Sequence, residues 1–226
     1  ATLRRQRQMC IRDRSEEDFF IESFPVGPLQ CNCSIIGDLK LKKCLVIDPG
    51  GDPEKILQII KHNQFKVVAI LHTHAHLDHI LASGIIKKET EAPLYLNEND
   101  KFLWEMIGQQ CQMFGIPEVK LPKIDGFIKD DQHLGCCDCI AIHTPGHTPG
   151  SMSFIFDEYK ILVAGDTLFK GSIGRTDLPG GDFNEIVKSI RDKLYSLDDE
   201  LTVITGHGPS TKIGIEKTEN MFVREL

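Results

Sequence analysis

The 226-residue sequence has no apolar run of the length that a membrane-spanning helix needs, about 18 residues or more. Its first residues also lack the apolar core of a secretory signal peptide. An excess of positive charge is absent too, because the formal net charge is −7. A net negative charge argues against nucleic acid or a membrane surface as the main partner. We therefore expect a cytoplasmic protein that acts on a small molecule.

Further absences narrow the chemistry. The sequence has no Gly-x-Ser-x-Gly segment, so it offers no serine nucleophile elbow for acyl-enzyme catalysis. Internal repeats and low-complexity segments are also missing. The eight cysteines are not spaced as a disulfide framework, and a chain of this length needs none. We expect them to be small buried side chains in a reducing compartment, with a cysteine metal site or redox pair as the alternative.

The first 18 residues differ in composition from the rest. They contain a cluster of five arginines and do not begin with methionine, so we expect these residues to be a disordered or artefactual extension. The alternative is a mitochondrial transit segment. We expect residues 19–226 to form a single domain. The arginines concerned are Arg4, Arg5, Arg7, Arg12 and Arg14.

From Phe19 onward, short apolar segments alternate with helical patterns in two blocks, 19–123 and 124–226. This order predicts two sheets packed face to face with helices outside, a layered α/β fold. The apolar stripe of the helix predicted at 99–113 is interpreted as core, with a substrate lid as the alternative. Strands are predicted at 19–24, 33–36, 43–48, 65–71, 92–96, 126–134, 137–142, 153–156, 161–164 and 201–205. The other helices are predicted at 54–61 (capped by Asp52 and Pro53), 81–90, 183–194 and 212–222.

The strand predicted at 65–71 leads directly into a run of four histidines and one aspartate. Imidazole and carboxylate are ligands for zinc, iron and manganese. His74 and His76 are spaced to bind one metal ion. Asp78 and His79 point another way and suit a second ion. His72 lies outside this pattern, and we expect it to have a structural role.

Three later segments also place a histidine or aspartate at the end of a predicted strand. Two Thr-Pro-Gly turns enclose His147, whereas His143 is expected to lie on the preceding strand. Asp166 follows an apolar strand and a glycine, and His207 stands between two glycines. Four such strand ends in one chain are hard to explain by coincidence, so they favour a metal site that is assembled from all of them.

The combination of HxHxDH, TPGHTPGS, GDTLF and GHGP resembles the metallo-β-lactamase superfamily, and within it the short glyoxalase II-like (hydroxyacylglutathione hydrolase-like) branch. The match covers residues 20–222. The resemblance implies an αββα sandwich of two mixed sheets, with the metal ions at one edge. It also implies that His74, His76 and His147 hold the first ion, that Asp78, His79 and His207 hold the second, and that Asp166 bridges the two.

The resemblance further implies two divalent ions, zinc foremost and iron or manganese as alternatives. It implies a metal-bridging hydroxide as the nucleophile, with Asp78 and Asp166 as catalytic carboxylates. The expected substrate is a small acyl thioester, and in the family that this chain resembles the thioester is linked to glutathione. Arg175 matches the basic position of the family's glutathione loop, and Lys170 opens the same loop. The structural alternative for Arg175 is an ion pair with a nearby carboxylate.

The sequence departs from glyoxalase II in two places. Asp177 stands where the family has a tyrosine, and the chain after Pro209 is too short for the family's basic helical region. Glutathione recognition is therefore left open, as are metal identity and oligomeric state.

Other readings remain beside the hydrolase. A persulfide dioxygenase has the same fold and would hold a single iron through His74, His147 and Asp166. A non-catalytic metal-binding protein is disfavoured because no ligand is missing. A β-lactamase is disfavoured because Asp166 stands where many of those enzymes carry cysteine. The acidic balance disfavours a nuclease.

Overall fold

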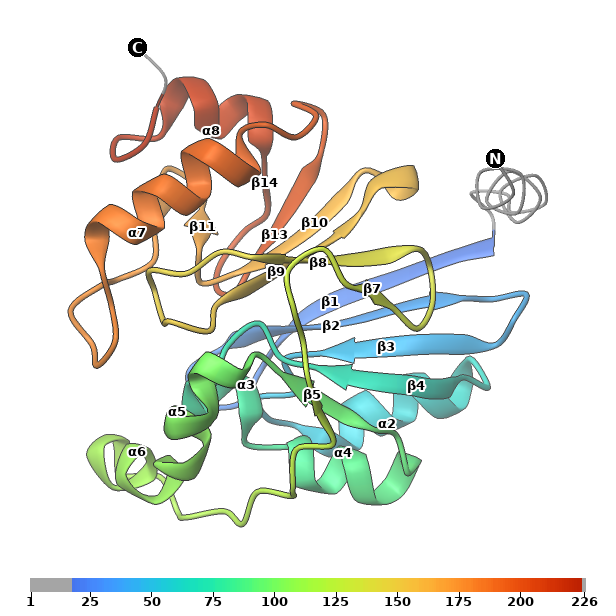
Figure 1. The fold of residues 1–226 in the computed structure, drawn as a ribbon. Helices are drawn as coiled ribbons and strands as arrows, with labels where there is room; N and C mark the ends of the chain where they lie inside the picture. The colour runs from blue at the N-terminus through green and yellow to red at the C-terminus, as the bar shows by residue number, and fades with distance from the viewer. Residues whose placement is uncertain (1–17, 225–226) are drawn as a thin grey trace.

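The computed structural model describes residues 18–224, so the extension expected at 1–18 lies outside the described residues apart from Asp18. The described chain forms two six-stranded sheets (Figure 1). The first has the order β1 (Phe19–Val26), β2 (Cys31–Asp38), β3 (Lys43–Ile47), β4 (Lys66–Leu71), β5 (Leu94–Leu96) and β6 (Gly126–Phe127). The second has the order β14 (Thr211–Lys212), β13 (Thr202–Thr205), β10 (Ile161–Gly165), β9 (Met152–Phe156), β8 (Cys139–His143) and β7 (His133–Leu134).

Helices lie on the outer face of each sheet (Figure 1). The first half contributes α2 (Pro53–His62), α3 (Leu77–Ile80), α4 (Ser83–Thr90), α5 (Lys101–Glu105) and α6 (Ile107–Phe114). The second half contributes α7 (Phe183–Lys188), a π-helical continuation (Ser189–Leu194) and α8 (Ile213–Glu219), together with the small hairpin of β11 (Leu168–Phe169) and β12 (Ser172–Ile173). No helix in residues 18–224 has both the length and the apolar character needed to cross a bilayer.

Alternating side chains divide the core into layers, as strand geometry requires. On β3, Leu45 and Ile47 pack between the two sheets against Phe154, whereas Cys44 and Val46 pack beneath α2 and α4. A third apolar cluster fixes α7 and α8 to the outer face of the second sheet. The expected sandwich of two mixed sheets with helices outside is therefore confirmed.

Parallel strands bring chemistry-bearing residues to one edge. β3 runs parallel to β4, and β10 runs parallel to β13, while both sheets also contain antiparallel pairs. The carboxyl ends of parallel neighbours meet at the same edge of a sheet. Asp48 and His72 therefore leave the first sheet together, and Asp166 and His207 follow the paired ends of β10 and β13.

Three local predictions are wrong. The segment 126–134 is not one strand, because it turns at Asp131, with φ of 58°, and carries the chain from β6 in the first sheet to β7 in the second. The helix expected at 99–113 is interrupted at Met106. Asp52 precedes α2 in a left-handed conformation and makes no side-chain cap, since its carboxylate accepts the Gly27 N–H at 2.9 Å instead.

The seven cysteines in the described part of the chain have buried side chains and form no disulfide with one another. Their burial agrees with the expectation of small core residues.

Candidate metal centre

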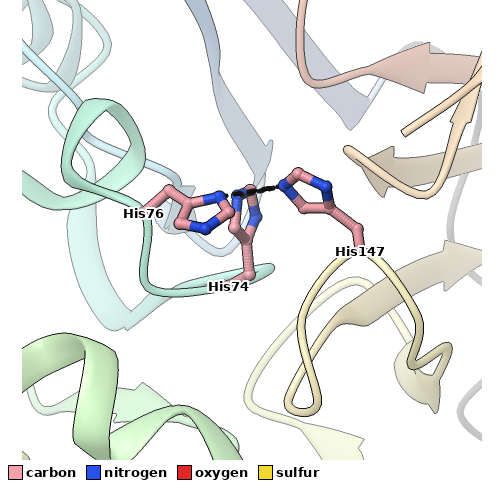
Figure 2. Close-up of side chains that lie close together, drawn as sticks. All are labelled: His74, His76 and His147. Atoms are coloured by element: carbon pink, nitrogen blue, oxygen red, sulfur yellow. Dashed lines mark hydrogen bonds between the residues drawn. The ribbon is translucent and has the colours of Figure 1, made fainter. Parts of the chain in front are cut away.

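Three histidine rings converge on one point from two loops (Figure 2). His74 and His76 come from the turn between β4 and α3, and His147 comes from the turn after β8. His147 Nε2 lies 2.9 Å from His76 Nδ1 and 3.2 Å from His74 Nε2. Three imidazole nitrogens so close together suit one cation better than they suit each other.

Neighbouring oxygens determine which ring nitrogen faces the centre. His147 Nδ1 lies 2.7 Å from the Arg175 carbonyl and donates its proton there. His74 Nδ1 lies 3.0 Å from Thr73 Oγ1, which itself donates to Asp48. With Nδ1 protonated in both rings, their Nε2 lone pairs point at the convergence point, as metal ligation requires.

A second group lies beside the first. His207 Nε2 is 3.0 Å from Asp78 Oδ2, and His79 Nε2 is 3.7 Å from the same oxygen. Asp166 lies between the groups: its Oδ1 is 3.4 Å from His79 Nε2 and its Oδ2 is 3.6 Å from His147 Nε2. The structure thus brings together all seven residues that the sequence suggested as ligands, with Asp166 in a position to bridge.

The protonation states suit cation binding. Burial and neighbouring histidine charges lower the pKa of His74 well below its usual value and that of His76 to about 3, so both rings are neutral. Burial alone would raise the pKa of Asp166, but the histidines around it hold that pKa well below its usual range. Burial lowers the pKa of His79, yet Cys31 and the carboxylates of Asp78, Asp166 and Asp48 outweigh this effect and raise it.

Two buried atoms further indicate that a cation belongs here. Among the described residues, His79 Nε2 and Asp166 Oδ1 are buried without a hydrogen-bond partner, a costly arrangement in a protein alone. Both face the centre and would be satisfied by a positive ion. The backbone also makes room for the carboxylate, because a Cβ on Gly206 would lie 1.9 Å from Asp166 Oδ1. The residues present therefore fit a pair of divalent ions.

Residues that the sequence interpretation missed hold these side chains in place. Asp48 accepts from His79 Nδ1 at 3.0 Å and from the backbone N–H of Thr73 at 2.7 Å. Asp100 accepts from the backbone N–H groups of Ala75 at 3.0 Å and Gly150 at 2.6 Å, which joins the two histidine loops. The position of Asp48 at the end of the strand predicted at 43–48 was the only sequence signal for its role.

Two further polar side chains fix the surrounding loops. Asn32 on β2 donates from Nδ2 to the carbonyls of Thr205 and Gly208, at 2.9 and 3.0 Å, on either side of His207. Gln110 on α6 accepts from the Leu77 N–H at 2.9 Å. The same side chain donates to the carbonyls of Ala75 at 3.1 Å and Leu103 at 2.8 Å.

His72 and His143 lie outside the cluster. His72 is buried, with Nε2 2.7 Å from Ser83 Oγ and Nδ1 3.1 Å from the Tyr95 carbonyl, which agrees with a structural role. His143 ends β8, as expected of a strand residue, and its Nε2 lies 2.9 Å from the Pro149 carbonyl.

A cavity of about 360 Å³ opens beside the cluster. Arg175 lines it, but its guanidinium forms two hydrogen bonds to Asp177, at 2.7 and 2.8 Å, so the ion-pair alternative describes its contacts. Lys170 is exposed after β11 and is not among the residues that line the cavity. The structure therefore does not bring Lys170 to the site.

The sequence and the fold match known proteins. Residues 26–207 match the model of the Metallo-beta-lactamase superfamily. The hydroxyacylglutathione hydrolase GloC of Haemophilus influenzae is 41% identical, over 90% of this chain and 97% of its own. A crystal structure described as BLEG-1 B3 metallo-beta-lactamase is 34% identical with a TM-score of 0.84, over 91% of this chain and all of its own.

A second solved structure bears on the metals. The crystal structure of TTHA1623 in a di-iron-bound form is 34% identical with a TM-score of 0.81, and it covers 89% of this chain and 99% of its own. The family match over residues 26–207 includes the segments that carry the His and Asp cluster described above. The chain belongs to the metallo-beta-lactamase superfamily, as a metal-dependent hydrolase.

Proposed function

We propose that the chain hydrolyses small acyl thioesters with two divalent metal ions. In this proposal, His74, His76 and His147 hold the first ion, and Asp78, His79 and His207 hold the second, with Asp166 between them. The observation that carries the proposal is the complete set of seven donors around two adjacent points, two of whose buried atoms have no hydrogen-bond partner. The hydroxyacylglutathione hydrolase name of a 41% identical relative supports the choice of thioesters.

When bound, the ions supply Lewis acidity that brings the pKa of water toward neutrality and polarises a carbonyl. The protein itself positions the ions and offsets their charge. Asp78 and Asp166 both have pKa values below the ordinary range, so they remain ionised and offset the charge of the ions. The lowered pKa of each makes it a poor proton acceptor. Their catalytic role is therefore electrostatic, and no protein side chain needs to act as the general base.

The competing function on the same residues is the persulfide dioxygenase, which would use one iron. The complete second set favours the hydrolase, since Asp78, His79 and His207 would have no purpose around a single ion. Zinc, iron and manganese all suit the donor set. The di-iron form of a 34% identical neighbour supports iron as one of the candidates.

The test is to purify the protein, count its metal ions, and measure thioester loss beside oxygen uptake. S-lactoylglutathione and the neutral thioester S-acetyl-N-acetylcysteamine serve for hydrolysis, glutathione persulfide for oxygen uptake, and a chromogenic cephalosporin for β-lactam cleavage. We expect two ions per chain and thioester hydrolysis. A single iron per chain with oxygen uptake and intact thioesters would refute the proposal.

Variants of the second set sharpen the test. His207→Ala removes one proposed ligand, so we expect loss of one ion and a fall in kcat of about 100-fold or more. His133→Ala on β7 is the matched control, since this histidine is exposed and lies outside the cluster. Unchanged hydrolysis in His207→Ala would contradict a two-ion reaction.

A further inference from the structure

The cavity beside the metal centre has one apolar wall. The cluster supplies its floor through the ring of His147 and the carboxylates of Asp78 and Asp166. Helices α5 and α6, which lie beside α3 at one end of the sandwich (Figure 1), supply most of the wall. The apolar residues that matter are Leu29, Leu103, Met106, Met113, Phe114 and Leu178.

Two of these side chains are exposed and are not part of the buried core. Met113 is 73% exposed and Phe114 is 46% exposed, at the end of α6. Large apolar side chains grouped at the mouth of a cavity are typical of a binding surface. Methionine adds a flexible, polarisable contact that adapts to the shape of a ligand.

The wall is fixed to the catalytic loop. Gln110, one turn before Phe114 on α6, bonds the backbone of Ala75 and Leu77 on either side of His76. The helix ends at Gly115, whose φ of 64° allows the chain to turn away. The distance between wall and cluster is therefore set by hydrogen bonds, which suits a surface that positions a substrate.

The cavity offers little to a charged ligand. Among the described residues that line it, Arg175 is the only lysine or arginine, and Asp177 occupies its guanidinium through two hydrogen bonds. Gln110 is engaged by backbone groups. A glutathione moiety carries two carboxylates and an ammonium group, which would lose water here without gaining charged partners.

We propose that the wall of α5 and α6 selects thioesters by an uncharged apolar acyl chain, so that Met113 and Phe114 determine specificity. The proposal rests on the thioester hydrolysis proposed above and names its substrate class. The carbonyl lies at the metal cluster, and the alkyl or aryl chain extends along the wall.

The experiment compares hexanoyl and acetyl thioesters of N-acetylcysteamine, and hexanoyl thioesters of N-acetylcysteamine and glutathione, on the metal-loaded protein. A fully buried methylene contributes about fourfold to kcat/KM, so even a half-open wall should favour hexanoyl over acetyl by at least about tenfold. We expect the double variant M113A/F114A to reduce this ratio to within about threefold, while metal content is retained.

The chain provides a matched control. Met221 and Phe222 are also adjacent, 79% and 47% exposed, and outside the cavity. M221A/F222A removes the same atoms and should leave the hexanoyl-to-acetyl ratio unchanged. A ratio near one in the parent protein, or one that M113A/F114A does not alter, would overturn the proposal. So would a tenfold or greater preference for the glutathione thioester.

Failure of the proposed function gives a different result. If no thioester is hydrolysed, binding of hexanoate and acetate to the metal-loaded protein, measured by calorimetry, decides the inference. Tighter binding of hexanoate that M113A/F114A abolishes and M221A/F222A preserves supports the apolar wall. Equal binding of the two acids, or a preference that survives M113A/F114A, rejects it.

Discussion

At the scale of single residues, the centre depends on side chains that touch no substrate. Asp48 is buried, and its Oδ2 holds the ring of His79 through Nδ1 while its Oδ1 accepts the Thr73 N–H. This pairing fixes the tautomer that directs His79 Nε2 at the centre. A ligand so oriented binds a metal more tightly than one that must first give up other conformations.

We therefore expect Asp48→Asn to weaken binding of the second metal ion by about 10- to 100-fold, because the amide can present its N–H to the ring and misalign it. Titration of the metal-free protein with zinc, followed by calorimetry, measures the change. Asp157→Asn, at an exposed carboxylate, is the control. Equal affinities in Asp48→Asn and the parent would show that Asp48 does not orient His79.

At the scale of elements, α6 serves both the active-site loop and the cavity. Gln110 makes three hydrogen bonds to backbone groups at Ala75, Leu77 and Leu103. Replacement by a methionine of similar length would leave these groups to find other partners in a half-buried place. Each buried polar group left unpaired costs about 1–3 kcal/mol.

We expect Gln110→Met to lower the free energy of unfolding of the metal-free protein by about 2–3 kcal/mol. Chemical denaturation measures this change. Gln112→Met, on the exposed side of the same helix, should alter stability by less than about 0.5 kcal/mol. Equal stabilities of the two variants would mean that water replaces the bonds of Gln110 and that α6 is not anchored as described.

At the scale of the whole molecule, protons and metal ions compete for the cluster. The pKa of His76 is lowered to about 3, so acid favours the unfolded chain, which accepts that proton near the ordinary histidine pKa of about 6.5. The stability that neutral His76 contributes is thus present above that pKa and lost as the pH falls. His79 and His207 have raised pKa values, so in the metal-free protein their contribution is present at lower pH and lost as the pH rises through them.

The raised pKa values of His79 and His207 favour protons on the second set of ligands, whereas the lowered pKa values of His74, His76 and His147 favour neutral rings in the first set. We expect metal content to fall steeply below about pH 6, with the second ion lost before the first. Dialysis at pH 8, 7, 6 and 5 followed by metal analysis measures the order of loss. Full retention of both ions at pH 5 would contradict it. The increase in Tm caused by metal should shrink over the same range.

The candidate ligands could be proposed from the sequence because each lies in a short segment whose local chemistry is informative. Apolar strands precede His74, Asp166 and His207, and glycine or proline turns enclose His147 and His207. Strands that alternate with helices indicate layers, and the strand ends of such layers gather polar residues. Residue type, spacing and strand position were enough to propose the candidate ligands and to predict the sandwich.

Contacts between segments that are distant in the sequence were decided only by the tertiary structure. Asp48 meets His79 across 31 positions, and Asp100 meets Gly150 across 50, which no local pattern encodes. The same holds for segment 126–134, which has apolar residues near both ends, although one end pairs with the first sheet and the other with the second. The sequence by itself determined the candidate donors and the layers, since the donors follow from residue type and spacing and the layers follow from local periodicity. The residues that support the donors and the apolar wall were decided by the folded structure, because packing sets which distant side chains meet.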